Sequence, residues 1–150
     1  MEAVIFSGIQ AAGKSTFYKQ RFFDTHLRIN LDMLRTRNRE RLLLQACIEM
    51  KQPFVVDNTN PTVVERARYI SAAKAAQFRV VGYFFQSNPG ESVRRNAERA
   101  EKWRVPVAGI YGTAARFEAL TFSEGFDALY TVRVSAEGTF IVEEQLRDGV

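Results

Sequence analysis

The stretch with the most specific chemistry is Gly8-Ile9-Gln10-Ala11-Ala12-Gly13-Lys14-Ser15-Thr16, which follows an apolar run at residues 3–6 and leads into a helix-like segment. Gly8 and Gly13 permit backbone dihedrals that a Cβ would forbid, so that the N–H groups of the loop converge on phosphate oxygens. Lys14 then neutralises the β- and γ-phosphates, and the Ser15 hydroxyl binds Mg²⁺. The helix that starts near Gly13 points its N-terminal dipole at the same anion. The pattern predicts a P-loop that binds ATP through Gly8, Gln10, Ala11, Ala12, Gly13, Lys14, Ser15 and Thr16.

Two carboxylates follow later strand-like segments. Asp32 comes after residues 26–30, and Asp57 ends the apolar run 54–56. Ligands of an open parallel sheet bind beyond the carboxyl ends of its strands, so both side chains are expected at the rim that carries the P-loop. Asp57 is placed to bind a Mg²⁺-coordinated water, which makes Ser15 and Asp57 the predicted metal-binding pair. Asp32 fits a general base that accepts the proton of an attacking hydroxyl, and the alternative is that it caps a turn.

Arginines are frequent in two segments of the chain. Arg95 and Arg99 are spaced i,i+4 in a predicted helix over residues 91–101, where they share one face and would close over ATP. In the run from Arg35 to Arg41 every second residue is an arginine. Residues two apart point to opposite sides of a helix, so the run predicts two opposed pairs, 35 with 39 and 37 with 41. Glu40 is spaced to pair with the arginine at 37.

Four other residues have more than one interpretation or a structural one. Thr59 and Asn60 are either helix caps or ligand contacts. The single histidine, His26, has no companion at metal-ligand spacing and is expected to be structural. Trp103 either stacks on adenine from a lid or anchors that lid to the core.

The remaining pattern alternates strands and helices, which predicts parallel strands joined by right-handed crossovers. Strands are expected at 3–7, 26–30, 54–56 and 78–85, and helices at 13–23, from between 35 and 40 to 50, from Asn60-Pro61 to 76, at 91–101 and from Pro106 to 120. Segments 128–134 and 139–142 predict a terminal hairpin. The predicted fold is α/β, a P-loop NTPase-type three-layer sandwich: a mostly parallel central sheet, helices on both faces, a helical Arg-rich lid and a C-terminal strand pair.

Length and composition predict a single domain over residues 1–150. With 46% hydrophobic and 25% charged residues the chain can bury a core, and its 12 Phe occur mostly in apolar runs, which favours packing over base stacking. The one cysteine, Cys47, excludes an internal disulfide and is expected to be buried.

The charge and the apolar runs bear on partners. A formal net charge of +4 is compatible with a polyanionic partner. The start of the chain lacks a basic segment followed by a long apolar one, and no apolar run reaches membrane-spanning length. We therefore expect a soluble, cytoplasmic protein with no membrane partner.

Four further segments carry a family resemblance: Arg28-Ile29-Asn30-Leu31-Asp32-Met33-Leu34-Arg35, Val56-Asp57-Asn58-Thr59-Asn60-Pro61, Arg66-Ala67-Arg68-Tyr69 and Gly125-Phe126. With the P-loop they resemble the kinase domain of polynucleotide 5′-hydroxyl kinases, including the kinase half of polynucleotide kinase-phosphatase, from Ile5 to about Val134. The resemblance implies ATP-dependent phosphorylation of a nucleic acid with a 5′-OH end. It implies that Asp32 is the general base, that Arg35 contacts the scissile and neighbouring phosphates, and that Arg95 and Arg99 are lid arginines. The catalytic set it predicts is Asp32, Lys14, Arg35 and Arg99.

Two departures from that family keep other functions open. Leu31 stands where members usually carry a basic residue, and Gln10-Ala11 stands where they often carry Pro-Gly. The leading prediction is a polynucleotide 5′-hydroxyl kinase. A kinase acting on a nucleoside, sugar or nucleotide-sugar hydroxyl is the second, and a non-catalytic ATP-binding module is the third. Asp32 argues against the third, because a module that only binds ATP has no use for an acceptor-side base.

Overall fold

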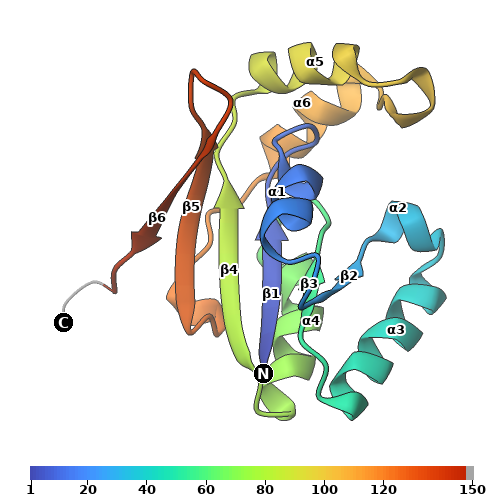
Figure 1. Ribbon diagram of the computed structural model, residues 1–150, viewed down its shortest axis with the longest axis vertical. Helices are drawn as coiled ribbons and strands as arrows, with labels where there is room; N and C mark the ends of the chain where they lie inside the picture. Colours follow the sequence, from blue (N-terminus) through green and yellow to red (C-terminus); the bar gives the residue numbers. More distant parts are fainter. Residues whose placement is uncertain (148–150) are drawn as a thin grey trace.

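A six-stranded sheet with the order β2-β3-β1-β4-β5-β6 forms the centre of the protein (Figure 1). The computed structural model describes residues 1–147, and residues 148–150 of the predicted domain lie outside the described part. The strands are β1 (Glu2–Ser7), β2 (Leu27–Ile29), β3 (Phe54–Val56), β4 (Arg79–Phe85), β5 (Ala128–Val134) and β6 (Phe140–Gln145). The first five pair in parallel and β6 pairs antiparallel with β5. The predicted mostly parallel sheet with a terminal strand pair is confirmed.

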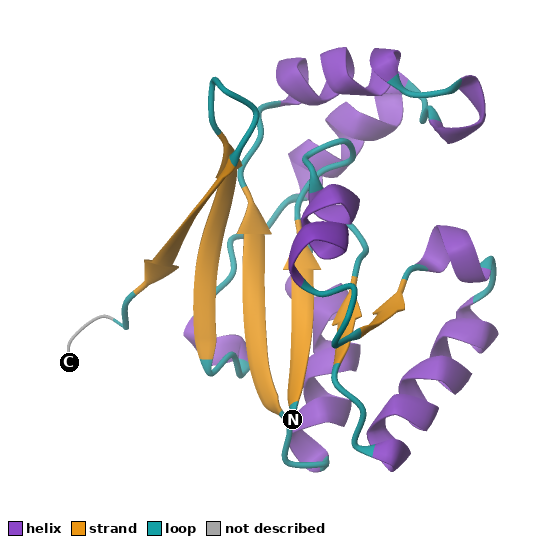
Figure 2. Ribbon diagram, viewed as in Figure 1, coloured by secondary structure: helices purple, strands orange, loops and turns teal. Residues whose placement is uncertain are grey.

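Helices cover both faces of this sheet and one end of it (Figure 2). They are α1 (Lys14–Arg21), α2 (Leu31–Leu34), α3 (Arg37–Met50), α4 (Val63–Ala75), α5 (Pro89–Glu98), α6 (Val107–Arg116) and the 3₁₀ turns η1 (Glu101–Trp103) and η2 (Phe122–Glu124). α1 packs on one face, and α3 and α4 pack on the other. The segment from α5 to α6 lies over the carboxyl ends of the strands as a lid (Figure 1). The predicted three-layer α/β fold is therefore confirmed.

Alternating side chains of the central strands fill two separate cores. On β1, Val4 and Phe6 face α1, whereas Ala3 and Ile5 face α3 and α4. The Phe6 ring lies 5.9 Å from that of Phe17 on α1, centroid to centroid. Strands buried on both faces in this way read as continuous apolar runs, which is why they were recognisable in the sequence. Cys47 is fully buried in the core under α3, as predicted.

The start of α4 differs from the prediction, which placed a cap at Asn60. The cap is Thr62, whose Oγ1 accepts a hydrogen bond from the Glu65 N–H at 3.2 Å. Asn60 has a φ of 44° and is buried, and its side-chain amide donates to the Phe6 carbonyl at 2.8 Å. Its side chain therefore bonds to β1 rather than to the helix, and the loop after β3 is fastened to the strand that carries the P-loop.

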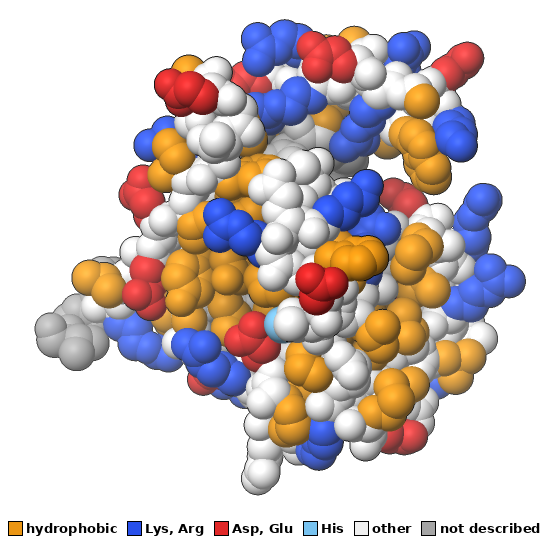
Figure 3. Space-filling model, viewed as in Figure 1, with side chains coloured by type: hydrophobic (Ala, Val, Ile, Leu, Met, Phe, Trp, Pro, Cys, Tyr) orange, Lys and Arg blue, Asp and Glu red, His pale blue; other side chains and the backbone are white. Residues whose placement is uncertain are grey.

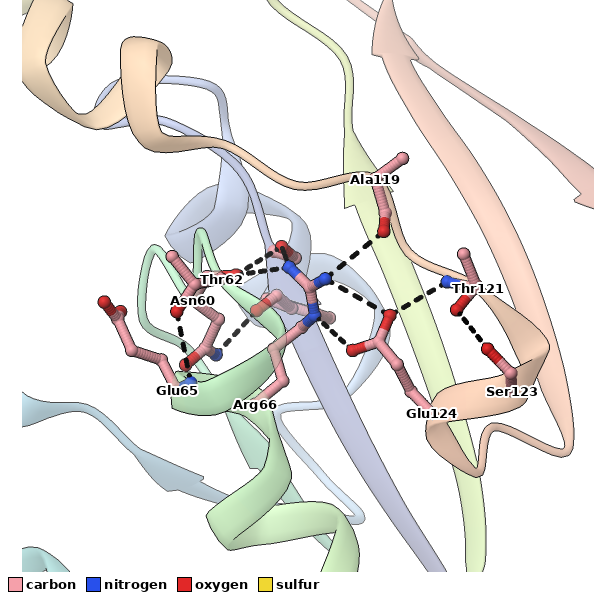
Figure 4. Close-up of polar contacts among 10 residues, drawn as sticks. Asn60, Thr62, Glu65, Arg66, Ala119, Thr121, Ser123 and Glu124 are labelled. Carbon is pink, nitrogen blue, oxygen red and sulfur yellow. Dashed lines mark hydrogen bonds and ion pairs between the residues drawn. The ribbon is translucent and has the colours of Figure 1, made fainter.

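A buried ion pair adds a second fastening of the same loop (Figure 4). Arg66 of α4 is fully buried, and its Nε donates to Glu124 Oε1 of η2 at 2.7 Å. Its Nη1 donates to the Asn60 carbonyl at 2.9 Å, and its Nη2 donates to the Ala119 carbonyl at 3.3 Å. One guanidinium thus joins α4, η2 and the loop beside the P-loop.

Within residues 1–147, no helix is long and apolar enough to cross a bilayer.

Candidate functional site

The P-loop connects β1 to α1, and its two glycines are required for different reasons. Gly13 has a φ of +99°, which favours glycine as predicted. Gly8 lies outside the left-handed region, so the dihedral argument is wrong there. A Cβ on Gly8 would instead lie 2.8 Å from the Phe85 Cβ of the neighbouring strand. Ala11 has a φ of 58°, an unusual conformation for a residue with a Cβ.

Lys14 is buried at the centre of the loop. Its Nζ donates to the Gly8 carbonyl at 2.9 Å and to the Ile9 carbonyl at 2.7 Å. Burial lowers the pKa of Lys14 to about 8; the nearby Arg99 charge also lowers it, while Asp57 and Asp32 oppose the shift. Asp57, Asp32 and Arg99 come from three separate segments, and each lies near enough to Lys14 to affect its pKa.

The predicted metal-binding pair is in contact. Ser15 Oγ donates to Asp57 Oδ2 at 3.0 Å, and the Asp57 side chain is 2% exposed. Hydroxyl and carboxylate oxygens are hard ligands that suit Mg²⁺, which in phosphate sites takes one or two protein ligands and completes its shell with waters and phosphate oxygens. Among residues 1–147 no group of three or more His, Cys, Asp or Glu side chains is arranged to hold a metal by itself. The donor set thus fits a Mg²⁺ ion that arrives with phosphates.

Arg28 is a member of this site that the sequence reasoning did not assign. Its Nε donates to Asp57 Oδ2 at 2.9 Å, and its Nη2 donates to Ser15 Oγ at 2.9 Å. The pairing of β2 with β3 indicates why Arg28 lies at this site. Arg28 pairs with Val55 across parallel strands, so it shares a face with the residue two positions further on, which is Asp57.

Asp32 lies on the exposed surface of the short helix α2, which follows β2. The residue that caps this helix is Asn30, whose Oδ1 accepts from the Met33 N–H at 2.9 Å, so Asp32 is free of the capping role considered for it. The Asn30 amide donates to the Asp57 carbonyl at 2.6 Å, and Asn58 Oδ1 accepts from the Leu31 N–H at 2.9 Å. Residues after β3 therefore fix the position of the helix that carries Asp32.

A buried carboxylate holds Asn58, the residue that bonds to the start of α2. Glu40 of α3 is buried, and it accepts hydrogen bonds from the Asn58 amide at 2.9 Å and from the Tyr69 hydroxyl at 2.9 Å. Arg37 donates to it at 2.8 Å, which confirms the predicted i,i+3 pair. Burial, together with the Glu40 charge and hydrogen bond, raises the pKa of Tyr69 to about 12. The tyrosine is therefore a neutral hydrogen-bond donor at neutral pH.

Arg35 is exposed and lies outside the helix that was expected to contain it. It ends α2 with a φ of 78°, whereas α3 begins at Arg37. The predicted pairing of residues 35 and 39 on one helix face is therefore wrong, because a turn separates them. Arg35 follows Asp32 by three residues and caps the C-terminus of the same short helix.

The lid arginines also differ from the prediction. α5 ends at Glu98, and Arg99 follows it in extended conformation with a ψ of 153°, so Arg95 and Arg99 do not share a helix face. Arg95 Nη1 donates to the Ala11 carbonyl at 3.5 Å, and Arg99 Nη1 donates to the Trp103 carbonyl at 3.5 Å. One arginine thus reaches the P-loop directly.

Gln10 and Trp103 show how the lid relates to the P-loop and to solvent. Gln10 Nε2 donates to Thr113 Oγ1 of α6 at 3.0 Å, so a P-loop side chain is bonded to the lid. Trp103 in η1 is 62% exposed, which excludes the core-anchor interpretation. Figure 3 shows a notch in the outline of the molecule between the lid and the α2–α3 region, with Lys and Arg side chains on both sides.

This fold and loop define a P-loop protein. A family model described as an AAA domain matches residues 30–120, which is more than half of the sequence, and the chain belongs to this family. The match includes both Asp32 and Asp57 and begins after the P-loop.

One curated relative is similar over most of the chain. The bifunctional polynucleotide phosphatase/kinase of Schizosaccharomyces pombe is 26% identical over 129 residues, which is 83% of this chain. The match covers 32% of that relative, so the chain spans about a third of its length.

Solved structures of distant sequence share the fold. A gluconokinase from Sinorhizobium meliloti 1021 has a TM-score of 0.62 at 15% identity, over 88% of this chain and 82% of that one. Kti12 of Chaetomium thermophilum in complex with ADP-AlF3 has a TM-score of 0.66 at 14% identity, over 87% and 88%. The PezAT toxin-antitoxin structure from Streptococcus pneumoniae has a TM-score of 0.68 at 12% identity, over 99% and 74%. These likenesses support the fold alone.

Proposed function

We propose that the protein transfers the γ-phosphate of ATP to the 5′-hydroxyl end of a polynucleotide. The observation that carries the proposal is the contact of the P-loop with the segments after β2 and β3: Ser15 Oγ donates to Asp57 Oδ2 at 3.0 Å, and Asn30, which caps the helix that carries Asp32, donates to the Asp57 carbonyl at 2.6 Å. Phosphoryl transfer needs a phosphate cradle, an acceptor-side base and positive charge over the transferred group. The named activity of the fission-yeast relative supports the polynucleotide acceptor.

Each group then has a stated task. The P-loop N–H groups and Lys14 bind the β- and γ-phosphates, and for this Lys14 exchanges its bonds to the Gly8 and Ile9 carbonyls for phosphate oxygens. Asp32 orients the acceptor hydroxyl and takes its proton. Ser15 and Asp57 would hold Mg²⁺, which when bound supplies charge neutralisation to the phosphates. Arg99 stabilises the charge that develops on the transferred group.

A second candidate is a small-molecule kinase acting on a nucleoside, sugar or nucleotide-sugar hydroxyl. The observation that favours it is Leu31, an uncharged residue directly before Asp32 where polynucleotide kinases usually carry a basic one. The test that separates the candidates is incubation with γ-labelled ATP and either 5′-OH oligonucleotides or a panel of small hydroxyl compounds. Label in the oligonucleotide alone supports the proposal, and label in a small molecule alone contradicts it.

The role of Asp32 is tested with Asp32→Asn, which keeps the shape of the side chain but cannot accept the proton. We expect the single-turnover transfer rate to fall by about 10²- to 10⁴-fold while ATP affinity changes little. Asp24→Asn is the matched control, because Asp24 is an exposed aspartate in the turn after α1. A wild-type rate in Asp32→Asn would remove Asp32 from the mechanism.

The role of Arg35 separates a polymer from a small acceptor. If Arg35 binds a strand phosphate, Arg35→Ala raises the KM for the oligonucleotide and reduces the slope of log affinity against log salt by about 1. The KM for ATP stays constant. Arg41→Ala serves as the control, since Arg41 is exposed on α3 and contacts Asn38. An equal defect for ATP would place Arg35 on the donor side.

A further inference from the structure

Arg28 lies on the two oxygen atoms that the P-loop chemistry assigns to Mg²⁺. Within residues 1–147 it is the only Lys or Arg side chain that hydrogen-bonds to either Ser15 Oγ or the Asp57 carboxylate. Both contacts measure 2.9 Å, so the guanidinium lies against the same two oxygens that a Mg²⁺ ion or its coordinated water would contact. Two cations, the guanidinium and the metal, therefore fit this pair.

The burial of Asp57 makes one of these cations necessary. Its side chain is 2% exposed, and a buried carboxylate without a compensating charge is costly. Arg28 supplies such a charge, because its guanidinium contacts both Asp57 and Ser15. If Mg²⁺ occupied the pair while Arg28 stayed in place, two positive groups would lie within contact distance and repel each other.

The surroundings of Arg28 allow it to leave. Its side chain is 27% exposed, and its remaining nitrogen contacts only Met33 Sδ, at 4.0 Å. Departure therefore breaks two hydrogen bonds at the Ser15–Asp57 pair and disturbs no core side chain.

We propose that Arg28 is an exchangeable internal cation: its guanidinium holds the Ser15–Asp57 pair in the nucleotide-free protein and is displaced from it by the metal that enters with ATP. The inference rests on the proposed use of ATP and adds a specific consequence. Mg²⁺ has to compete with Arg28. This side chain therefore raises the Mg²⁺ concentration that is needed for half-maximal nucleotide binding.

The experiment compares the wild type with Arg28→Gln, in which the charge is lost and an amide remains. The quantity measured is the Mg²⁺ concentration that gives half-maximal binding of a fluorescent ATP analogue. We expect it to fall about tenfold in Arg28→Gln, because a competing positive charge has been removed. Arg79→Gln is the matched control, since Arg79 is an exposed arginine at the start of β4, at the opposite end of the sheet. It should keep the wild-type value.

A second measurement needs no nucleotide. MgCl₂ alone should raise the melting temperature of Arg28→Gln above that in NaCl of equal ionic strength, and should leave the wild type unchanged, because Arg28 already fills the site. Arg28→Lys keeps the charge but cannot reach both oxygens with a planar fork, so its Mg²⁺ requirement should lie between the other two. If Arg28→Gln fails to fold, Arg28→Lys is compared with the wild type in its place.

An unchanged or raised Mg²⁺ requirement in both Arg28 variants would overturn the inference. So would an equal response of the wild type and Arg28→Gln to MgCl₂ alone. Failure of the proposed function looks different: the wild type would bind no ATP at any Mg²⁺ concentration, while the nucleotide-free MgCl₂ titration would still distinguish the two proteins.

Discussion

Lys14 is the residue whose protonation links nucleotide binding to pH. Burial lowers its pKa from 10.5 to about 8, so near pH 8 about half of the free protein carries a neutral lysine. The phosphates of ATP favour the charged ammonium and raise this pKa on binding. Binding therefore takes up a proton above neutral pH, and ATP affinity is full below pH 8 and falls as the pH rises through 8.

We expect an uptake of up to about half a proton per ATP at pH 8. Titration calorimetry in two buffers of different ionisation enthalpy measures it, with MgATP as the ligand. The control is the same experiment at pH 6.5, where Lys14 is already charged and the uptake should vanish. Equal heats in both buffers at pH 8 would show that the lysine is charged in the free protein.

Ala11 stores strain in the P-loop. Its φ of 58° belongs to the left-handed region, which costs a residue with a Cβ about 1–2 kcal/mol. Ala12 is buried beside it without a positive φ. Both alanines lose a buried methyl group when changed to glycine, but only Ala11→Gly also relieves strain. Ala11→Gly should therefore be less destabilising than Ala12→Gly by about 1–2 kcal/mol in urea unfolding, and equal losses would contradict the strain.

At the scale of the elements, the ion pair between Arg66 and Glu124 joins α4 to η2. Glu124→Gln leaves the buried guanidinium without its counter-charge, so we expect a loss of about 3–5 kcal/mol of unfolding free energy. The matched control is Glu65→Gln, which breaks the exposed pair of Glu65 with Arg116 and should cost at most about 1 kcal/mol. Chemical denaturation of the three proteins gives both values. Equal losses would mean that burial adds nothing to the first pair.

Short-range patterns predicted the elements well and their junctions badly. The strands and the P-loop were recognisable because continuous apolar runs and glycine spacing are local signals. The cap at Asn60 was placed wrongly because that side chain bonds to β1, 54 residues away in the sequence. Arg99 was placed on a helix that in fact ends one residue earlier.

The residues missed entirely make contacts between elements. Arg28 reaches Ser15 and Asp57 from another strand, and Arg66 reaches Glu124 across 58 residues. No local pattern encodes such distances. The register of neighbouring strands contains the first contact, but that register becomes known only once the strand order is known.

At the scale of the whole molecule, all six strands belong to one sheet, and both cores share β1 and β4. We therefore expect a single unfolding transition in urea by far-UV circular dichroism. The one tryptophan lies in the exposed lid, so its emission maximum in the native protein should already be close to that of the unfolded chain. Two separate transitions would contradict the prediction of one domain.

The close approach of Phe140 to Gly13 bears on which C-terminal truncations of the chain would keep activity. A Cβ on Gly13 would lie 3.0 Å from Phe140 Cε1, and the Phe140 ring also packs on Phe17 of α1, with centroids 5.1 Å apart. The P-loop and the start of α1 therefore pack against β6. A truncation after β5 would keep every residue assigned to the chemistry but would remove Phe140, which packs beside Gly13 and Phe17. We therefore expect a fragment to need β6 for activity.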